Sequence, residues 1–306
     1  MEIELAHTQG FCAGVAMAIE VVDRALEKYG TPLYVRHHIV HNHSVIKDFE
    51  EKGVIFVEEL SDVPDNQTVI FSAHGVGPEV YQEAKDRGLE FIDSTCPLVT
   101  KVHREANRFS ERAIHTVLIG HKGHQELIGT SGHVNPDLLH IVEEASDVEK
   151  LDIPVDKPVG YLTQTTLSVS DTSDIIDALK EKFPHIQGAP KAQICYATQN
   201  RQDAVLELTE TCDVIIICGS PHSSNSNRLK ERAENQNVPS YIIDTVTELK
   251  MDWLLNKKRV GISSGASVPQ SVVNDVVLKI KETYTDAPVH QKPTIEKDIN
   301  FPLPKI

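Results

Sequence analysis

Three of the five cysteines in this 306-residue chain stand immediately before a stretch with the sequence pattern of a helix. Cys12, Cys96 and Cys195 each follow a short, partly apolar run, which is typical of a strand-to-helix junction. The N-terminus of a helix stabilises negative charge and can lower the pKa of a thiol. These positions are suited to thiolates, and we expect the three side chains to converge on one centre.

The spacing of these cysteines decides between the metals that thiolates bind. A single cysteine is ordinarily a small buried hydrophobe, but three at equivalent positions indicate a shared role. A structural zinc site would need a fourth ligand and ligand pairs at short spacing, and neither is evident in the sequence. Thiolate ligands at long spacing favour a 4Fe-4S cluster, in which three cysteines leave one iron open as a Lewis acid and electron relay. Cys212 and Cys218 lie outside the repeated position, and we expect them to be ordinary buried residues.

The elements that must position the cysteines recur three times along the chain. The cysteines are 84 and 99 residues apart, and each begins the same order of helix, strand, polar loop, strand and a strand that breaks at polar residues. Alternating strands and helices predict an α/β fold of three pseudo-symmetric units, each with a parallel-rich sheet whose polar loops gather at the carboxyl ends of strands. The predicted units are 1–93, 94–192 and 193–284, followed by an extended, proline-containing tail over 285–306.

Apolar runs and periodicity place the individual elements. We expect strands at 32–36, 54–57, 68–71, 116–119, 139–142, 159–162, 214–217, 240–243 and 260–262. We expect helices after each of the three cysteines and over 45–52, 78–87 and 270–284, and another that is capped by Ser170–Thr172 and ends near Phe183.

Four polar residues in the strand-end loops could act on a substrate. His41, His74 and His124 follow predicted strands. They are either ordinary surface or core histidines or, because they recur at equivalent places, imidazole groups that bind phosphate oxygens. Glu126 is the only carboxylate in one of these polar loops. It is either a first-turn glutamate that complements a helix dipole or a proton donor, which a cluster-driven loss of a hydroxyl group would need.

Hydroxyl and amide side chains gather in the third unit. Ser223, Ser224 and Asn225 end a strand and open a helix, so one of them is expected to cap the helix. The same set, with backbone N–H groups, forms a phosphate cradle, and the turn Gly265–Ser267 supplies a comparable group from the final strand. The glycine-rich nucleotide motifs are absent from the sequence, so a standard nucleotide cradle is not expected.

Composition limits the partners. The formal net charge of −15 argues against nucleic acid and anionic membrane surfaces as partners, although it does not exclude an anionic small substrate. No run reaches the roughly 18 apolar residues of a membrane span, and the first residues lack the pattern of a signal peptide. We therefore expect a cytoplasmic protein with reduced thiols.

Several motifs together resemble one known family, that of 4-hydroxy-3-methylbut-2-enyl diphosphate reductase, also called the LytB/IspH family. The resemblance covers nearly the whole chain. The motifs that carry it lie at Gly10–Val15, Tyr34–Asn42, Phe71–Val76, Thr95–His103, Thr163–Ser168, Ile194–Thr198, Ser223–Leu229 and Gly265–Ser267.

The resemblance implies an iron–sulfur oxidoreductase of isoprenoid biosynthesis, at the last step of the methylerythritol phosphate route. It implies a 4Fe-4S cluster held by Cys12, Cys96 and Cys195, with Glu126 and Thr165 orienting the substrate hydroxyl group and relaying protons. It also implies an electron donor such as ferredoxin or flavodoxin. The diphosphate-binding positions that it implies are His41, His74, His124, Ser223, Ser224, Asn225 and Ser267.

Two other kinds of function remain open from the residues. A cluster-dependent hydro-lyase would use the same open iron without net electron transfer, so a requirement for an external reductant separates it from a reductase. An iron–sulfur electron carrier or redox sensor would not need Glu126 and three sets of polar loops, which is the sequence feature against it.

Overall fold

The computed structural model describes residues 1–154, 156–188, 193–296 and 299–306. The chain forms two compact units by its internal contacts. The first unit comprises Met1–Ala16, Val40–Asp48 and Tyr196–Asn300. The second comprises Met17–Ile39, Phe49–Cys195 and Phe301–Ile306.

The second unit contains two parallel sheets. The sheet β3-β2-β4-β5 is built from β2 (Leu33–Arg36), β3 (Val54–Val57), β4 (Thr68–Phe71) and β5 (Glu90–Asp93). The helical elements η1 (Leu60–Asp62) and α3 (Pro78–Asp86) belong to this unit. The helix α1 (Ala13–Tyr29) begins in the first unit and continues in the second, and most of α2 (His43–Glu51) belongs to the first. The apolar side chains of β4 are fully buried, and those of α3 pack on the same core. This packing holds the carboxyl end of β4 in place.

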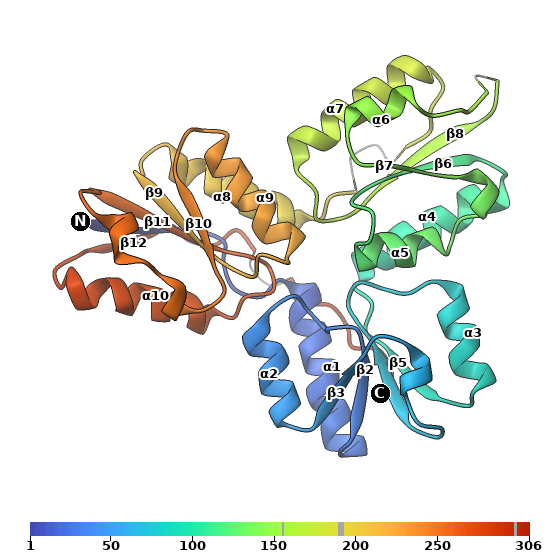
Figure 1. Ribbon diagram of the computed structural model, residues 1–306, viewed down its shortest axis with the longest axis horizontal. Coiled ribbons are helices and arrows are strands. Elements are labelled where there is room, and N and C mark those ends of the chain that lie inside the picture. The colour runs from blue at the N-terminus through green and yellow to red at the C-terminus, as the bar shows by residue number, and fades with distance from the viewer. Residues whose placement is uncertain (155, 189–192, 297–298) are drawn as a thin grey trace. The chain divides into compact units, whose positions relative to one another are not determined.

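The other sheet of this unit has the order β7-β6-β8 (Figure 1). Its strands are β6 (His115–Ile119), β7 (Leu139–Val142) and β8 (Val159–Thr163), all parallel. The segment around Gln187 adds backbone hydrogen bonds to the outer side of β8. The helical elements are α4 (Pro97–Glu111), α5 (Gln125–Ser131), η2 (Pro136–Leu138), α6 (Ala145–Glu149) and α7 (Val169–Lys182).

The first unit contains a five-stranded parallel sheet of order β10-β9-β11-β1-β12. Its strands are β1 (Glu2–Leu5), β9 (Val214–Cys218), β10 (Ser240–Ile243), β11 (Arg259–Ser264) and β12 (Val289–Gln291). Separate apolar clusters lie against it, one including α10 and the other including α8 and α9. The helical elements are α8 (Tyr196–Thr209), α9 (Ser224–Glu234), η3 (Val246–Glu248), η4 (Met251–Leu254) and α10 (Gln270–Thr283).

The three sheets repeat one pattern of pairing. In each, the first strand of the repeat lies between the other two, as in β3-β2-β4, β7-β6-β8 and β10-β9-β11. The residue that follows the central strand donates its N–H to the last residue of the neighbouring strand in every sheet, from His37 to Val57, Gly120 to Val142 and Gly219 to Ile243. The expected α/β class with parallel sheets is therefore confirmed, and the three equivalent sheets agree with an internal triplication.

The exact element ends differ from expectation at several places. The strands β3, β4, β7 and β10 have the predicted bounds, and each of the three cysteines directly precedes a helix. The cap of α7 is Ser168 rather than the expected Ser170–Thr172, because the Ser168 hydroxyl accepts from the Asp171 N–H. The boundary predicted after residue 192 adjoins 189–192, which lie outside the described residues, and the predicted unit ranges stay a proposal.

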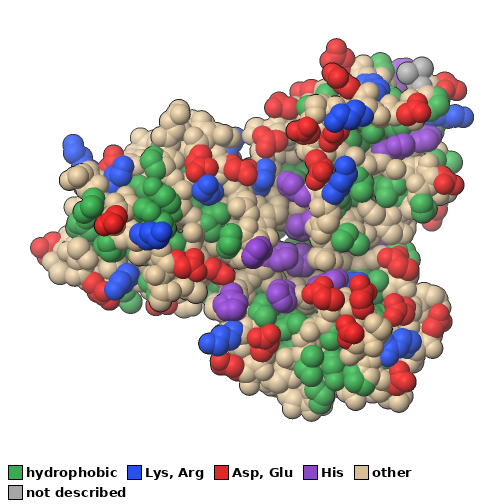
Figure 2. Space-filling view, in the orientation of Figure 1, with side chains coloured by type: hydrophobic (Ala, Val, Ile, Leu, Met, Phe, Trp, Pro, Cys, Tyr) green, Lys and Arg blue, Asp and Glu red, His purple; other side chains and the backbone are tan. Residues whose placement is uncertain are grey.

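The surface carries both signs of charge. Asp and Glu side chains are spread over the face shown in Figure 2, intermingled with Lys and Arg side chains. Many form short-range pairs, such as Arg24 with Glu20 and Lys230 with Glu234. Over the residues that the structure describes, no helix is long and apolar enough to cross a membrane.

Candidate functional site

The three cysteines share one backbone arrangement. The N–H group of Cys12 donates to Ala266 O, that of Cys96 to Ala73 O and that of Cys195 to Thr165 O, each at 3.0 Å. The acceptors lie two residues beyond the ends of β11, β4 and β8, which are equivalent strands of the three sheets. Each cysteine is thus held at the carboxyl end of a parallel strand and at the start of a helix.

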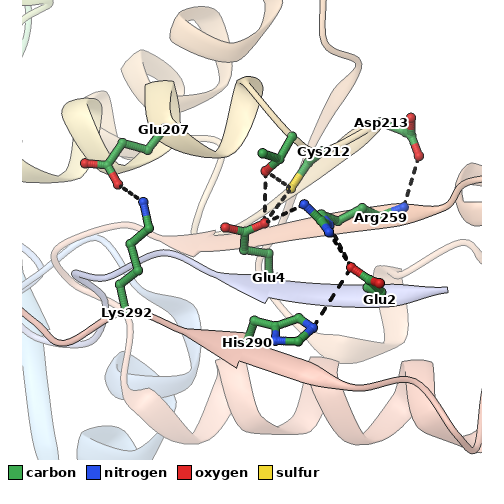
Figure 3. Close-up of polar contacts among 9 residues, drawn as sticks. Glu2, Glu4, Glu207, Cys212, Asp213, Arg259, His290 and Lys292 are labelled. Carbon is green, nitrogen blue, oxygen red and sulfur yellow. Dashed lines mark hydrogen bonds and ion pairs between the residues drawn. The ribbon is translucent and has the colours of Figure 1, made fainter.

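The remaining cysteines differ from these three in their surroundings. Cys12, Cys96 and Cys195 are partly exposed, whereas Cys212 and Cys218 are buried. Burial raises the pKa of the Cys212 thiol to about 11 and that of Cys218 to about 12. Cys212 lies beside Glu4, whose negative charge adds to this effect (Figure 3). Both thiols stay protonated at neutral pH, which fits the ordinary structural role expected for them.

In the first unit, the polar loop after β9 opens α9. The hydroxyl group of Ser223 accepts from the Ser226 N–H at 3.3 Å and caps the helix, as expected for one of these residues. Asn225 is buried, yet neither its Nδ2 nor its Oδ1 has a hydrogen-bond partner within the described part of the chain. A buried amide without partners is costly unless a ligand supplies them. Its place in the first turn of a helix is suited to an anion.

The turn after β11 connects a cysteine to a histidine in the same unit. Ala266 O accepts from the Cys12 N–H, and the Ser267 hydroxyl donates to His41 O at 3.1 Å. A side chain at Gly265 would collide with Ser226 Oγ, so glycine is needed for α9 to approach this turn closely. The structure therefore brings Cys12, His41 and Ser267 to one turn.

In the second unit, Glu126 and Thr165 are directly bonded. The carboxylate accepts from the Thr165 N–H at 2.6 Å and from its hydroxyl group at 2.9 Å. The Glu126 side chain is only 3% exposed, and burial raises its pKa to about 7 although both Thr165 bonds oppose the rise. A carboxyl group with this pKa can hold or release a proton at neutral pH.

The location of Glu126 corrects one expectation. It lies in the first turn of α5 rather than in a loop, because His124 caps that helix and ends the polar segment. Glu126 therefore has the first-turn position expected from helix-dipole arguments, and it is also buried. The Thr165 backbone also links Glu126 to a cysteine, since its carbonyl accepts from the Cys195 N–H.

His74 and His124 lie together in the second unit, with ring centroids 5.9 Å apart and the rings edge to face. His124 Nδ1 accepts from the Glu126 N–H at 3.2 Å, so the neutral ring carries its proton on Nε2. His74 Nδ1 is 3.2 Å from Ser72 Oγ. The structure thus groups His74, His124, Glu126 and Thr165 in this unit, while His41, Ser223, Ser224, Asn225 and Ser267 belong to the other.

The sequence reasoning missed two residues that hold the Cys12 loop. Ser264 Oγ accepts from the Gly10 N–H at 2.9 Å, and the fully buried Arg201 donates to Gly10 O at 2.8 Å. Thr198, Arg201 and Gln202 fall on one face of a helix, and a polar face of this kind is ordinarily exposed to solvent. The structure buries that face, so no local pattern in the sequence pointed to Arg201.

The three cysteine thiols are the donors that a metal cluster would use, but the described residues do not form a ready-made metal site. No three or more His, Cys, Asp or Glu side chains among them lie together in a metal-binding arrangement. The three partly exposed thiols nevertheless occupy equivalent strand-to-helix junctions. Three such thiols suit an iron–sulfur cluster better than they suit zinc, which would call for a fourth ligand.

Curated relatives match the whole chain. A protein of Saccharophagus degradans named 4-hydroxy-3-methylbut-2-enyl diphosphate reductase is 51% identical over 308 residues, covering 100% of this chain and 99% of its own. A protein of the same name from Pseudomonas aeruginosa is 49% identical over 308 residues, covering 100% and 98%.

Solved structures and a family model agree with these relatives. The E-1-hydroxy-2-methyl-but-2-enyl-4-diphosphate reductase of Plasmodium falciparum matches with a TM-score of 0.95 and 39% identity, covering 99% of this chain and 95% of that one. A structure of (E)-4-hydroxy-3-methyl-but-2-enyl diphosphate reductase matches with a TM-score of 0.65 and 30% identity, covering 92% and 100%. The family model described as LytB protein matches residues 3–281. This chain therefore belongs to the LytB protein family.

Proposed function

We propose that this chain reduces 4-hydroxy-3-methylbut-2-enyl diphosphate to isopentenyl and dimethylallyl diphosphate, with loss of the hydroxyl group as water. The observation that carries the proposal is the buried carboxyl group of Glu126, whose pKa is about 7 and which is bonded to Thr165 beside the Cys195 backbone. The names of the full-length relatives, one of which is described as the terminal enzyme of the non-mevalonate pathway, support it.

Cys12, Cys96 and Cys195 would hold a 4Fe-4S cluster in this proposal. Their partial exposure and their equivalent backbone bonds support that assignment. When bound, such a cluster supplies two electrons in single steps and an open iron that acts as a Lewis acid. A small electron carrier such as ferredoxin or flavodoxin would supply those electrons in the cytoplasm.

Glu126 is the proton donor in the proposed reaction. The substrate, two electrons and two protons give the product and one water molecule, so the departing hydroxyl oxygen must receive a proton. A carboxyl group with a pKa near 7 is partly protonated at neutral pH and can supply it. Thr165 holds the carboxyl group through its N–H and hydroxyl groups and orients the proton.

The diphosphate would be bound by hydroxyl, amide and imidazole N–H donors. In the first unit these are His41, Ser223, Ser224, Asn225 and Ser267. The unpaired amide of Asn225 at the start of α9 supports this role, because helix N-termini and amide groups bind phosphate oxygens. In the second unit, His74 and His124 would contribute imidazole N–H groups, and the bond from Glu126 N leaves the neutral His124 ring with its proton on Nε2.

The test is an anaerobic assay of the cluster-loaded protein with the hydroxymethylbutenyl diphosphate and a chemical one-electron reductant. Isoprenoid diphosphate products are measured with and without the reductant. We expect products only when reductant is present. Cys212→Ser serves as the cysteine control, because this thiol is buried and stays protonated at neutral pH.

The possible results separate the alternatives. Loss of water from the substrate without consumption of reductant, giving a dehydrated product in place of isopentenyl or dimethylallyl diphosphate, would favour a hydro-lyase. A cluster-loaded protein that turns over no substrate but is oxidised and reduced reversibly would favour an electron carrier or sensor. Either result would refute the reductase proposal.

A further inference from the structure

Arg201 on α8 is the bulkiest of the fully buried side chains in the described part of the chain, at 0% exposure. Its Nη1 atom donates to Ala197 O at 3.0 Å and to the two carboxylate oxygens of Glu296 at 3.1 and 3.2 Å. Its Nη2 atom donates to Gly10 O at 2.8 Å. A buried guanidinium is tolerated only when a counter-charge and hydrogen-bond acceptors surround it. Glu296 supplies the charge and the two carbonyl groups supply the acceptors.

The counter-charge comes from the C-terminal tail. Glu296 is 11% exposed, and it also accepts from Asn200 Nδ2 at 3.1 Å. The tail is first docked by β12, which pairs in parallel with β1. Figure 3 shows the accompanying ion pairs of His290 with Glu2 and of Lys292 with Glu207, whose side chains are partly or largely exposed. Glu296 therefore differs from these neighbours, because its carboxylate meets a buried charge rather than a solvated one.

The Arg201 bond to Gly10 acts on the segment that leads to Cys12. Gly10 has a φ of +80°, and its N–H donates to Ser264 Oγ. Its carbonyl belongs to the Gly10–Phe11 peptide plane, so the Arg201 bond fixes the orientation of that plane. Two residues later, the Cys12 N–H is bonded to Ala266 O. The backbone before the cysteine is thus fixed at three points, and one of them depends on Arg201.

We propose that Arg201 is a positioning residue for Cys12, and that Glu296 of the tail, by neutralising Arg201, keeps the Cys12 loop in the geometry that retains the iron–sulfur cluster. The inference rests on the proposed function, because it takes Cys12 to be a cluster ligand. Residues that orient metal ligands typically affect metal affinity by about 10- to 100-fold when they are replaced.

The experiment measures iron loss rather than turnover. Glu296→Gln keeps the size and one acceptor oxygen but removes the charge that faces Arg201. Cluster-loaded protein is mixed anaerobically with an iron chelator, and the fading of the cluster absorption gives the rate of iron release. We expect release to be about tenfold faster in Glu296→Gln than in the unmodified protein.

Two control variants separate cluster positioning from general stability. Lys292→Gln removes an exposed ion pair of the same tail without touching Arg201. Val276→Ala removes buried contacts from α10 in the core of the same unit and lowers the thermal midpoint. We expect iron release within twofold of the unmodified protein in both controls, even though Val276→Ala unfolds at a lower temperature.

Arg201→Lys provides an independent test if Glu296→Gln does not fold. Lysine keeps the charge and the pair with Glu296, but one ammonium group cannot replace the guanidinium fork that reaches Glu296, Ala197 and Gly10 together. Faster iron release with a near-normal thermal midpoint supports the proposal. The proposal would be overturned if the rate of iron release in every variant simply increased as its thermal midpoint decreased. An unmodified protein that binds no cluster would instead overturn the proposed function.

Discussion

Replacing Glu126 by glutamine tests whether burial sets the pKa of its carboxyl group. In the fold, this pKa is raised from 4.5 to about 7. The unfolded chain therefore releases the Glu126 proton at a lower pH than the folded protein does. Ionisation of Glu126 then opposes folding, with no effect well below pH 4.5 and the full effect above pH 7. Glutamine has the same shape and no charge, so it removes this pH-dependent cost.

The magnitude follows from the two pKa values. One pH unit of difference corresponds to about 1.4 kcal/mol. For 4.5 and about 7, the free energy of unfolding of the glutamine variant, relative to the unmodified protein, is expected to rise by about 2.5 kcal/mol between pH 5 and pH 8. The Thr165 N–H can still donate to the glutamine oxygen, and the Thr165 hydroxyl can accept from the amide. Any change in the strength of these bonds alters the free energy of unfolding by the same amount at pH 5 and at pH 8, so it does not affect the expected difference.

The assay is urea unfolding of both proteins without a cluster, at several pH values. Glu111→Gln is the matched control, because Glu111 is an exposed glutamate on α4. The free energy of unfolding of Glu111→Gln, plotted against pH, should run parallel to that of the unmodified protein. If the Glu126→Gln curve is also parallel from pH 5 to pH 8, the raised pKa is wrong. The cluster-loaded Glu126→Gln protein should retain its iron but lose most turnover, and full activity would refute the proton-donor role.

Three further substitutions test two residues of the site and one buried histidine outside it. Cys96→Ser should lose most bound iron after anaerobic reconstitution while Cys212→Ser retains it; equal iron content in both would remove Cys96 from the ligand set. Asn225→Leu should weaken inhibition by inorganic pyrophosphate about tenfold without lowering the thermal midpoint, because the buried amide lacks partners within the described chain; unchanged inhibition would exclude Asn225 from anion binding. Burial lowers the pKa of His103 to about 4, so protonation favours the unfolded chain and stability falls as the pH drops from about 6.5. His103→Asn should reduce the loss between pH 7 and pH 5 by about 2 kcal/mol, and an unchanged pH dependence in urea unfolding would contradict this.

Much of the candidate site was visible in the sequence because local patterns encode it. Each cysteine directly precedes a helix, as predicted from the apolar runs and helical periodicity around it. The cap at Ser223 was also expected from residue type alone. The raised pKa of Glu126 was not, because it arises from burial and from Thr165, which lies 39 residues away in the chain.

Some strands escaped prediction because their own sequences are uninformative. The strand β1 alternates acidic and apolar residues over four positions, and β5 has only two apolar residues, which lie between two acidic ones. The strand β12 is an exposed strand of three residues. β1 is a strand because it fits beside β11, from which it is separated by more than 250 residues. Pairing at that distance depends on the assembled sheet rather than on local preference.

The sequence by itself determined the α/β class, the threefold recurrence and the strand-to-helix place of each cysteine. These features depend on hydrophobic period and residue type, which act over a few neighbouring residues. Only the tertiary structure decided that β1 completes the sheet of the last repeat, and that Arg201 lies buried between Gly10 and Glu296. The residues next to a buried polar side chain in the sequence do not indicate which charged group will pair with it. Its partners come from distant segments, and the free-energy cost of burying the charge arises only when those segments pack together.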